Sequence, residues 1–400
     1  MARRMRRAAD LLSDVEGHWF PRLHSVRLHR LGTAEQLLTS SRFIVPTVES
    51  ICIIAWEPEN AYGDPTWSSA IAALERRITT TPRKIRAFSL TRITQHNPLL
   101  ERILLEVTRK FSLRSLHTAP PLFTELVATQ VSQASKLQQL SVEEANNDDS
   151  TMSSTFFATP NSILFSSLRD LKITGRPIVL LNALSSLDAT LLKLTLTSMG
   201  PSDVNSAGIT RSYCRKLACC ISHRYPGLHE LHLCDAAVGN DHDVLWMRDL
   251  EPLSKCTSLQ KFSIKRFWAV IRNEDLGTLT RKWLLLRTLV LLHLVHAPPE
   301  VPDNFVSWEG LIALRRHCPE LTEVSINRFN PAPPIPRPPE PSPQLSTMLL
   351  AFEDPRSNMF PRQTAQFLSL LWPSIRLSVQ YDDNPTDEWK EVVSLLAFRC

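Results

Sequence analysis

The sequence predicts an α/β solenoid of about eleven or twelve irregular repeats. Each repeat consists of a helix, a short segment that ends the helix, and a short parallel strand. Three observations predict this fold: an apolar triplet that recurs along most of the chain, amphipathic helical segments that precede it, and prolines between the two. A repeat array also explains how 400 residues can share a continuous core, because each repeat needs only its neighbours to bury its apolar face.

The recurring triplet consists of apolar residues spaced L-x-x-L-x-L. Its copies begin at Leu23, Val48, Ile85, Leu113, Leu137, Leu168, Leu191, Leu228, Leu259, Leu286 and Leu321, with a degraded twelfth at Ile375. From position 23 to position 321 the copies start about 30 residues apart, slightly more than the ~20–29 residues of a typical leucine-rich repeat. The last two apolar positions are two residues apart, so in a strand both point into the core. In a solenoid of this kind the curved parallel sheet forms the concave face and the helices form the convex face. The residue between the two apolar positions then faces solvent on the concave face.

Helices are predicted before the strands. Residues 99–107 carry apolar side chains at the i, i+3, i+4 spacing of an amphipathic helix, and residues 123–134 repeat it. Asn97 and Pro98 suit the N-cap and the first turn of the earlier helix. Proline cannot continue a helix, so a proline two residues before the triplet separates helix from strand. Such prolines are Pro21, Pro46, Pro226, Pro319 and Pro373.

Four segments are expected along the chain. Residues 1–22 form an N-terminal helix or cap, with the helix near 6–15, and residues 23–329 form the repeat array, interrupted by a polar loop at 143–160. Residues 330–343 hold eight prolines and form an extended linker. Residues 344–400 form a degenerate repeat and cap, with helices expected at 366–372 and 389–398.

The segment from Leu311 to Ile326, LIALRRHCPELTEVSI, is the sharpest motif in the chain. It resembles the cysteine-containing leucine-rich repeats of F-box proteins, whose units read L-x-x-L-x-x-x-C-P-x-L-x-x-L-x-L, and the irregular period resembles the fungal type. Looser copies lie at Tyr225–Leu233 and Leu253–Leu259. The resemblance implies a protein-binding array and kinship with substrate receptors of ubiquitin ligases. The F-box itself, a helical module that docks the ligase adaptor, is not evident before Leu23.

Composition argues against several function classes. Ten glycines in 400 residues, with neither GxGxxG nor GxxxxGK[ST], disfavour nucleotide and dinucleotide folds, so we expect no cofactor and no enzymatic activity. Eight scattered cysteines and no recognisable secretory signal favour reduced thiols in an intracellular protein, cytoplasmic or nuclear. The most apolar run, residues 283–295, is too short to span a bilayer, so no membrane association is expected.

Two groups of residues have side chains of the types that bind metal ions. Cys214, Cys219, Cys220 and His223 fall within a predicted repeat helix, where cysteine acts as a small apolar residue. The run Asp241–His242–Asp243 reads as a solvated loop. No second ligand pair with zinc-site spacing accompanies either group, so we predict no metal site.

The concave face is the predicted binding surface. Residues expected there are Arg27, Arg30, Arg92, His232, Lys261, Lys265, Arg266 and Arg328. Such a basic strip suits an acidic surface on a partner protein, although the same charges could simply be solvated. A net charge of +5 and aromatics at only 7% disfavour nucleic acid as the ligand.

These observations together predict a protein–protein interaction module, most specifically the substrate-recognition part of an F-box-type ubiquitin ligase complex. A ligase adaptor would then be a further partner if an F-box exists upstream. The alternative is a repeat-only scaffold protein with no ligase role. The missing motifs speak against a hydrolase or a metal enzyme, and the sparse aromatics speak against an RNA-binding protein.

Overall fold

The computed structural model describes residues 23–31, 33–55, 65–80, 85–93, 95–143, 163–198, 209–235, 244–293, 306–326, 329–330, 348–350, 361–372, 375–378 and 387–397. Contacts divide the chain into two compact units. Unit 1 comprises Met1–Gly175 and Ser186–Thr190, and unit 2 comprises Arg176–Ser185 and Leu191–Cys400. This division falls inside the predicted array. The predicted N-terminal helix and the proline-rich linker after residue 330 lie outside the described residues, as does nearly all of the polar loop at 143–160.

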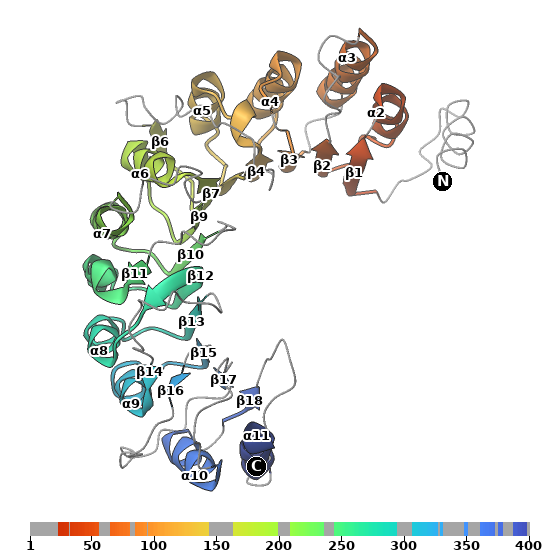
Figure 1. The fold of residues 1–400 in the computed structure, drawn as a ribbon. Helices are drawn as coiled ribbons and strands as arrows, with labels where there is room; N and C mark the ends of the chain where they lie inside the picture. Colours follow the sequence, from red (N-terminus) through yellow and green to blue (C-terminus); the bar gives the residue numbers. More distant parts are fainter. Residues whose placement is uncertain are drawn as a thin grey trace. The chain divides into compact units, whose positions relative to one another are not determined.

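Unit 1 is built on parallel strands that follow one another in the sheet in chain order. The strands are β1 (Ser25–Leu31), β2 (Ser50–Ala55), β3 (Ala87–Thr91), β4 (Ser115–Thr118), β5 (Gln139–Val142) and β7 (Asp170–Gly175). The helices are α2 (Ala34–Ser41), α3 (Pro65–Thr80), α4 (Pro98–Lys110) and α5 (Glu125–Ser132), with the 3-10 turn η1 (Pro120–Leu122) before α5. Figure 1 shows these helices on one side of the strands. A small pair, β6 (Ile163–Phe165) and β8 (Leu187–Ala189), is also parallel.

Unit 2 repeats the arrangement. Its sheet runs β9 (Lys193–Ser198), β10 (Glu230–Asp235), β12 (Lys261–Val270), β13 (Thr288–His293), β15 (Glu323–Ile326), β17 (Met348–Leu350) and β18 (Leu377–Ser378). Its helices are α6 (Pro177–Ser186), α7 (Ile209–Arg224), the 3-10 helix η3 (Met247–Lys255), α8 (Asn273–Thr280), α9 (Trp308–His317), α10 (Pro361–Leu371) and α11 (Asp387–Ala397). Short strands β11 (Val244–Trp246), β14 (Val306–Ser307) and β16 (Phe329–Asn330) add local pairs.

The predicted triplets form the core, and this confirms the leucine-rich-repeat solenoid fold. Leu231 of β10 pairs in register with Phe262 of β12, and Phe262 pairs with Leu289 of β13, so equal motif positions stack from repeat to repeat. All three side chains are fully buried. Each such side chain contributes on the order of 1.5–3 kcal/mol through burial of apolar surface.

The helices begin and end where local chemistry dictates. The Asn97 side chain accepts hydrogen bonds from the amides of Leu99 and Leu100, as expected of an N-cap. The next helix begins at Glu125, two residues later than predicted, because the Thr124 hydroxyl caps it by accepting from Val127 N. In the C-terminal region α10 begins at Pro361, five residues earlier than predicted, and β17 adds a strand that the sequence analysis did not anticipate.

One position links four repeats of unit 2 to the preceding helix or the turn that follows it. It lies three residues before the first apolar residue of the triplet, and in the sharpest motif it is Cys318. The thiol of Cys318 donates to Thr280 O over 3.9 Å, and that of Cys256 donates to Tyr225 O over the same distance. Larger side chains do the same elsewhere: Trp283 Nε1 donates to Leu253 O at 3.1 Å and Tyr225 Oη to Leu184 O at 3.1 Å. This position therefore satisfies carbonyls at the end of the preceding helix.

The buried thiols are expected to be chemically inert. Burial raises the pKa of Cys256 to about 11 and that of Cys318 to about 12, and only the thiolate reacts with alkylating agents. Iodoacetamide near neutral pH should therefore modify the exposed Cys219 and leave Cys256 and Cys318 intact, as measured by peptide mass spectrometry. Unfolding in urea should make all three reactive. Labelling of native Cys318 at the rate of Cys219 would contradict this assignment.

Candidate partner-binding surface

We call the face of each sheet that lies opposite to the helices its inner face. It is the face that the sequence predicts as the concave, partner-binding one. Strand alternation places the residue between the two core positions of each triplet on this face. Across unit 1 these residues are in register from β1 to β7. They are Arg27, Cys52, Ser89, His117, Ser141 and Lys172. Apart from Cys52 the row is polar, with small side chains between the exposed Arg27 and a charged cluster at the β4–β7 end.

The charged cluster centres on Glu143, the residue that follows β5. Lys172 Nζ lies 2.7 Å from Glu143 Oε2, and the Ser141 hydroxyl donates to Glu143 Oε1. His117 Nε2 lies 3.3 Å from the same Oε1 atom, although the geometry does not make a hydrogen bond and this nitrogen has no other hydrogen-bond partner among the described residues. Three neighbouring strands thus supply one pre-formed arrangement of cation, anion and imidazole.

The electrostatics of this cluster hold His117 neutral and Glu143 charged. Burial lowers the pKa of His117; the charge of Glu143 opposes this, and that of Lys172 reinforces it. Burial by itself would raise the pKa of Glu143. The hydrogen bonds from Lys172 and Ser141, together with the nearby positive charges, outweigh burial and lower that pKa. The cluster therefore presents a lysine–glutamate ion pair with an imidazole nitrogen beside it.

A pH dependence of stability follows from His117. Its folded-state pKa lies below the ordinary value of 6.5, so between the two values the unfolded chain binds more protons. Stability contributed by the neutral imidazole is therefore present above about pH 6.5 and is lost as pH falls through that value. We expect His117→Gln to reduce the loss of unfolding free energy between about pH 7 and pH 5, measured by urea titration.

Part of the slope should remain in His117→Gln, because burial also lowers the pKa of His232 and of His317. An identical pH slope in wild type and His117→Gln would contradict the assignment.

The inner face of unit 2 carries two rows of side chains in register across its strands. The first row is largely charged, and the second row includes buried residues. In register across β9, β10, β12, β13 and β15 lie Lys193, Glu230, Lys261, Thr288 and Glu323. Charge alternates over the first three strands of this row, so Lys261 stands between Glu230 and the neutral Thr288. The next row holds Thr195, His232, Ser263, Val290 and Ser325. Ser263 and Ser325 are buried, and their hydroxyls have no hydrogen-bond partner in the described part of the chain.

His232 lies beside the charged row. Its Nε2 is 3.5 Å from Glu230 Oε2 on the same strand. Burial lowers the pKa of His232; Glu230 opposes this shift, and Lys261 and Lys193 add to it. The imidazole is half-buried and neutral near pH 7, so it offers a partner a hydrogen-bonding group rather than a charge.

The predicted site residues fall in both units. In unit 1, Arg27 is exposed on β1, and Arg92 is exposed directly after β3 with a left-handed φ of 60°, uncommon for a residue other than glycine. In unit 2, His232, Lys261 and Lys265 lie on the inner face, and Lys265 is the most exposed of the three. Arg30 lies on β1 and Arg266 on β12, but their side chains are outside the described ones, and Arg328 is outside the described residues altogether.

His117, Ser141, Glu143 and Lys172 are not among the site residues predicted from the sequence. Three of them occupy the position between the two core residues of a triplet, as in Leu116–His117–Thr118. Aligning the triplets by this position would have found the row. It would not have found the contact with Glu143, which lies one residue beyond its strand.

The ligand-type cysteines do not form a metal cluster in the structure. Cys214, Cys219 and Cys220 lie on α7 and form no disulfide, with Cys214 buried and Cys219 exposed. Within the ranges that the structure describes, no three His, Cys, Asp or Glu side chains gather closely enough to hold a metal ion. The other candidate, Asp241–Asp243, lies outside those ranges.

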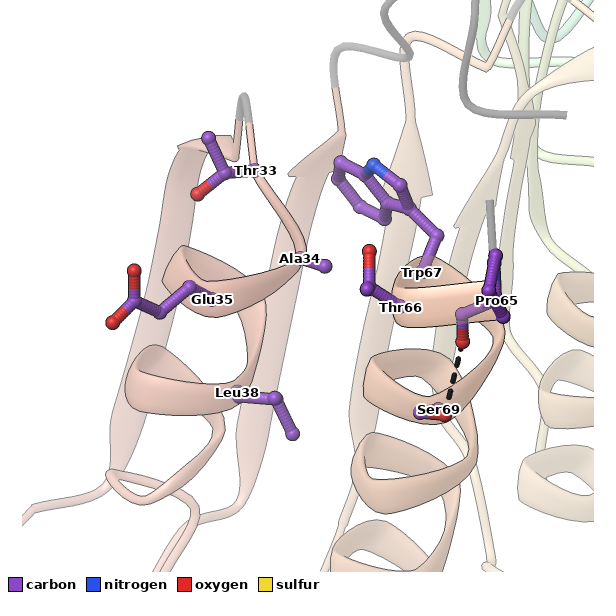
Figure 2. A pocket seen from close by; sticks show the side chains of 8 residues that line it. All are labelled: Thr33, Ala34, Glu35, Leu38, Pro65, Thr66, Trp67 and Ser69. Atoms are coloured by element: carbon purple, nitrogen blue, oxygen red, sulfur yellow. Dashed lines mark hydrogen bonds between the residues drawn. The ribbon is translucent and has the colours of Figure 1, made fainter. Parts of the chain in front are cut away.

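An open groove lies between the first turns of α2 and α3, on the helical side of unit 1 (Figure 2). Its volume is about 740 Å³. Leu38 and Trp67 give it apolar walls, and Glu35 brings the one charged side chain of its lining. Nothing in the lining resembles a catalytic arrangement, since a nucleophile paired with a base is missing from these residues.

No family model matches the chain, and no curated protein matches it significantly. Solved structures to which it is similar include the yeast Rad7–Elc1 complex, at 11% identity over 89% of this chain and 76% of that chain, with a TM-score of 0.37. A leucine-rich-repeat protein of Leptospira interrogans shows 11% identity over 79% and 72%, with a TM-score of 0.33. The TLR13–ssRNA13 complex shows 10% identity over 93% and 57%, with a TM-score of 0.34. These similarities are too distant to carry a functional argument.

A helix needs about 20 mostly apolar residues to cross a bilayer. Among the described residues, no helix is both long enough and apolar enough to do so.

Proposed function

We propose that this protein is a protein-interaction module that binds its partner on the inner face of the repeat sheets. The observation that carries the proposal is the register of polar and charged side chains on that face, above all the Lys172–Glu143 pair beside His117 and the row from Lys193 to Glu323. Parallel neighbours in a sheet lie about 4.8 Å apart, so such rows present ordered groups that can recognise a complementary surface.

The finer proposal is substrate recognition within an F-box-type ubiquitin ligase complex. Its support is the resemblance of the segment Leu311–Ile326 to the cysteine-containing repeats of F-box proteins. The alternative is a repeat-only scaffold with no ligase role. In both cases the chain itself would catalyse no reaction, and its contribution would be to bind and position a partner that presents acidic groups to Lys261 and Lys265.

Affinity purification of the tagged protein from its own cells, with partners identified by mass spectrometry, tests both versions. Recovery of a ligase adaptor and a cullin supports the receptor. A stable partner without them supports the scaffold and removes the ligase role. Turnover of generic ester, phosphate or peptide substrates by the purified protein would overturn the proposal that it is not an enzyme.

Charge reversal locates the binding face. Lys261→Glu/Lys265→Glu changes the inner face of unit 2, and we expect it to weaken capture of the partner. The matched control is Arg215→Glu/Lys216→Glu, which makes the same change of charge at two exposed positions of α7 on the helical side. Equal capture by wild type and the inner-face variant, or equal loss in the control, would remove the inner face of unit 2 as the site.

A further inference from the structure

A second surface lies at the ends of helices α8 and α9, away from the inner face. We call it the basic helix-end surface and define it by Arg281, Lys282, Leu284, Leu285, Arg316 and His317. Arg281 caps the C-terminal end of α8, and Arg316 and His317 lie in the last turn of α9. The Cys318 thiol donates to Thr280 O at 3.9 Å, so these two helix ends are adjacent.

Arg281 and Arg316, from the ends of two different helices, both lie near His317. The pKa of His317 is lowered by burial and by the positive charges of Arg281 and Arg316, so both guanidinium groups are within electrostatic reach of one imidazole. The acidic residues of these helices, Glu274 and Glu309 among them, are in the first turns, at the opposite ends. Glu320, just beyond α9, is paired with Arg287 at 3.0 Å.

Two consecutive leucines stand at the tip of the turn between α8 and β13. Leu284 is 56% exposed and Leu285 is 41% exposed. The flanking Trp283 and Leu286 are fully buried and fix the turn. Among the described residues, no other exposed large apolar side chains are adjacent in sequence.

Cations at helix C-termini have an ordinary explanation, because they offset the helix dipole and stabilise the helix. That explanation does not account for two exposed leucines beside them. A surface with cations around an apolar tip complements a segment that carries both acidic and apolar side chains. A nucleic acid would use the cations and leave the leucines without a partner.

We propose that the basic helix-end surface binds an acidic, leucine-containing segment of a protein, independently of the inner face. Carboxylates of that segment pair with Arg281, Lys282 and Arg316, and an apolar side chain covers Leu284 and Leu285. The site is distinct from Lys261 and Lys265, so it offers a second contact to the same partner or to another protein.

The test uses the full chain and fluorescein-labelled peptides in fluorescence anisotropy. One peptide alternates glutamate and leucine, a second replaces leucine by alanine, and a third replaces glutamate by lysine. We expect the glutamate–leucine peptide to bind most tightly and the lysine peptide not to bind. The Arg281→Glu/Lys282→Glu variant should weaken binding about tenfold or more at low salt, where exposed charges are least screened. Leu284→Ser/Leu285→Ser should bind the leucine and alanine peptides equally.

The matched control is Arg109→Glu/Lys110→Glu, which makes the same change of charge at the end of α4 in unit 1. It should bind like wild type, as should the inner-face variant Lys261→Glu/Lys265→Glu, so failure of this proposal is separable from failure of the inner-face proposal. Thermal melts check that each variant is folded, and Arg281→Gln/Lys282→Gln takes the place of Arg281→Glu/Lys282→Glu if the latter is not. The proposal is overturned if no peptide binds, if the control loses as much affinity, or if an oligouridine of equal charge binds more tightly than the peptide.

Discussion

Trp308→Ala is expected to lower the free energy of unfolding of unit 2 by about 3–5 kcal/mol, the range for removing a fully buried tryptophan. Trp308 begins α9 and is 1% exposed. Its ring centroid lies 4.7 Å from that of Phe329 on β16 and 4.7 Å from that of Phe367 on α10, both in edge-on arrangements. One side chain therefore joins α9 to α10, and alanine would leave a cavity between them.

Urea denaturation followed by circular dichroism measures this loss as a shift of the transition midpoint. Trp308→Phe keeps one ring in the contact and should cost less than the alanine variant. Leu284→Ala removes an exposed side chain from the same unit and should change stability by no more than about 0.5 kcal/mol. A loss below about 1 kcal/mol in Trp308→Ala would mean that α10 does not depend on this contact.

The repeat architecture could be predicted because its core positions follow a short pattern that recurs along the sequence. Positions such as Leu116, Leu231 and Phe262 recur at fixed spacing, and each is buried by the equivalent position of the adjacent repeat. Side-chain alternation in a strand then defines the inner face without further information. The helix cap at Asn97 was predictable for the same reason, since its partners lie two and three residues away.

The binding surface could be predicted only in outline. The pairing of Glu143 with Lys172 crosses from β5 to β7 over 29 positions of sequence, and nothing local in the sequence indicates it. Lys261 was expected in a basic strip, but the parallel register sets it next to Glu230. The sequence shows a cysteine at position 318 but not its hydrogen bond to Thr280 O. Trp283, at the equivalent position of another repeat, donates to Leu253 O through an indole nitrogen instead of a thiol.

Two glycines in unit 2 lead to opposite expectations for the same substitution. A Cβ added at Gly310 on α9 would lie 2.6 Å from Asn273 Oδ1 and 2.7 Å from Val306 Cγ1, closer than real side chains approach. Asn273 cannot easily move, because its Oδ1 accepts from Ser307 N at 3.1 Å and its Nδ2 donates to Ser307 Oγ at 2.7 Å. Overpacking of this kind costs about 1–3 kcal/mol.

Gly277, on α8, is the matched control. A Cβ there would meet only the Cβ of Ala313 at 3.7 Å, an ordinary contact. Alanine is favoured over glycine in a helix by about 1 kcal/mol, so Gly277→Ala should raise the free energy of unfolding by up to that amount. The same gain partly offsets the clash at Gly310, and Gly310→Ala should still lower it.

Urea midpoints of the two variants measure the difference, and opposite signs are expected. Stabilisation by Gly310→Ala would show that α8 and α9 can separate at this point without loss, which would contradict the tight junction that Asn273 and Ser307 make. Gly310 is needed because a side chain there would collide with Asn273 of α8, and not because its backbone conformation requires glycine. Asn273→Ala should therefore reduce the clash at Gly310. The loss caused by Gly310→Ala in the Asn273→Ala background should then be smaller than in wild type, which a double-mutant cycle measures directly.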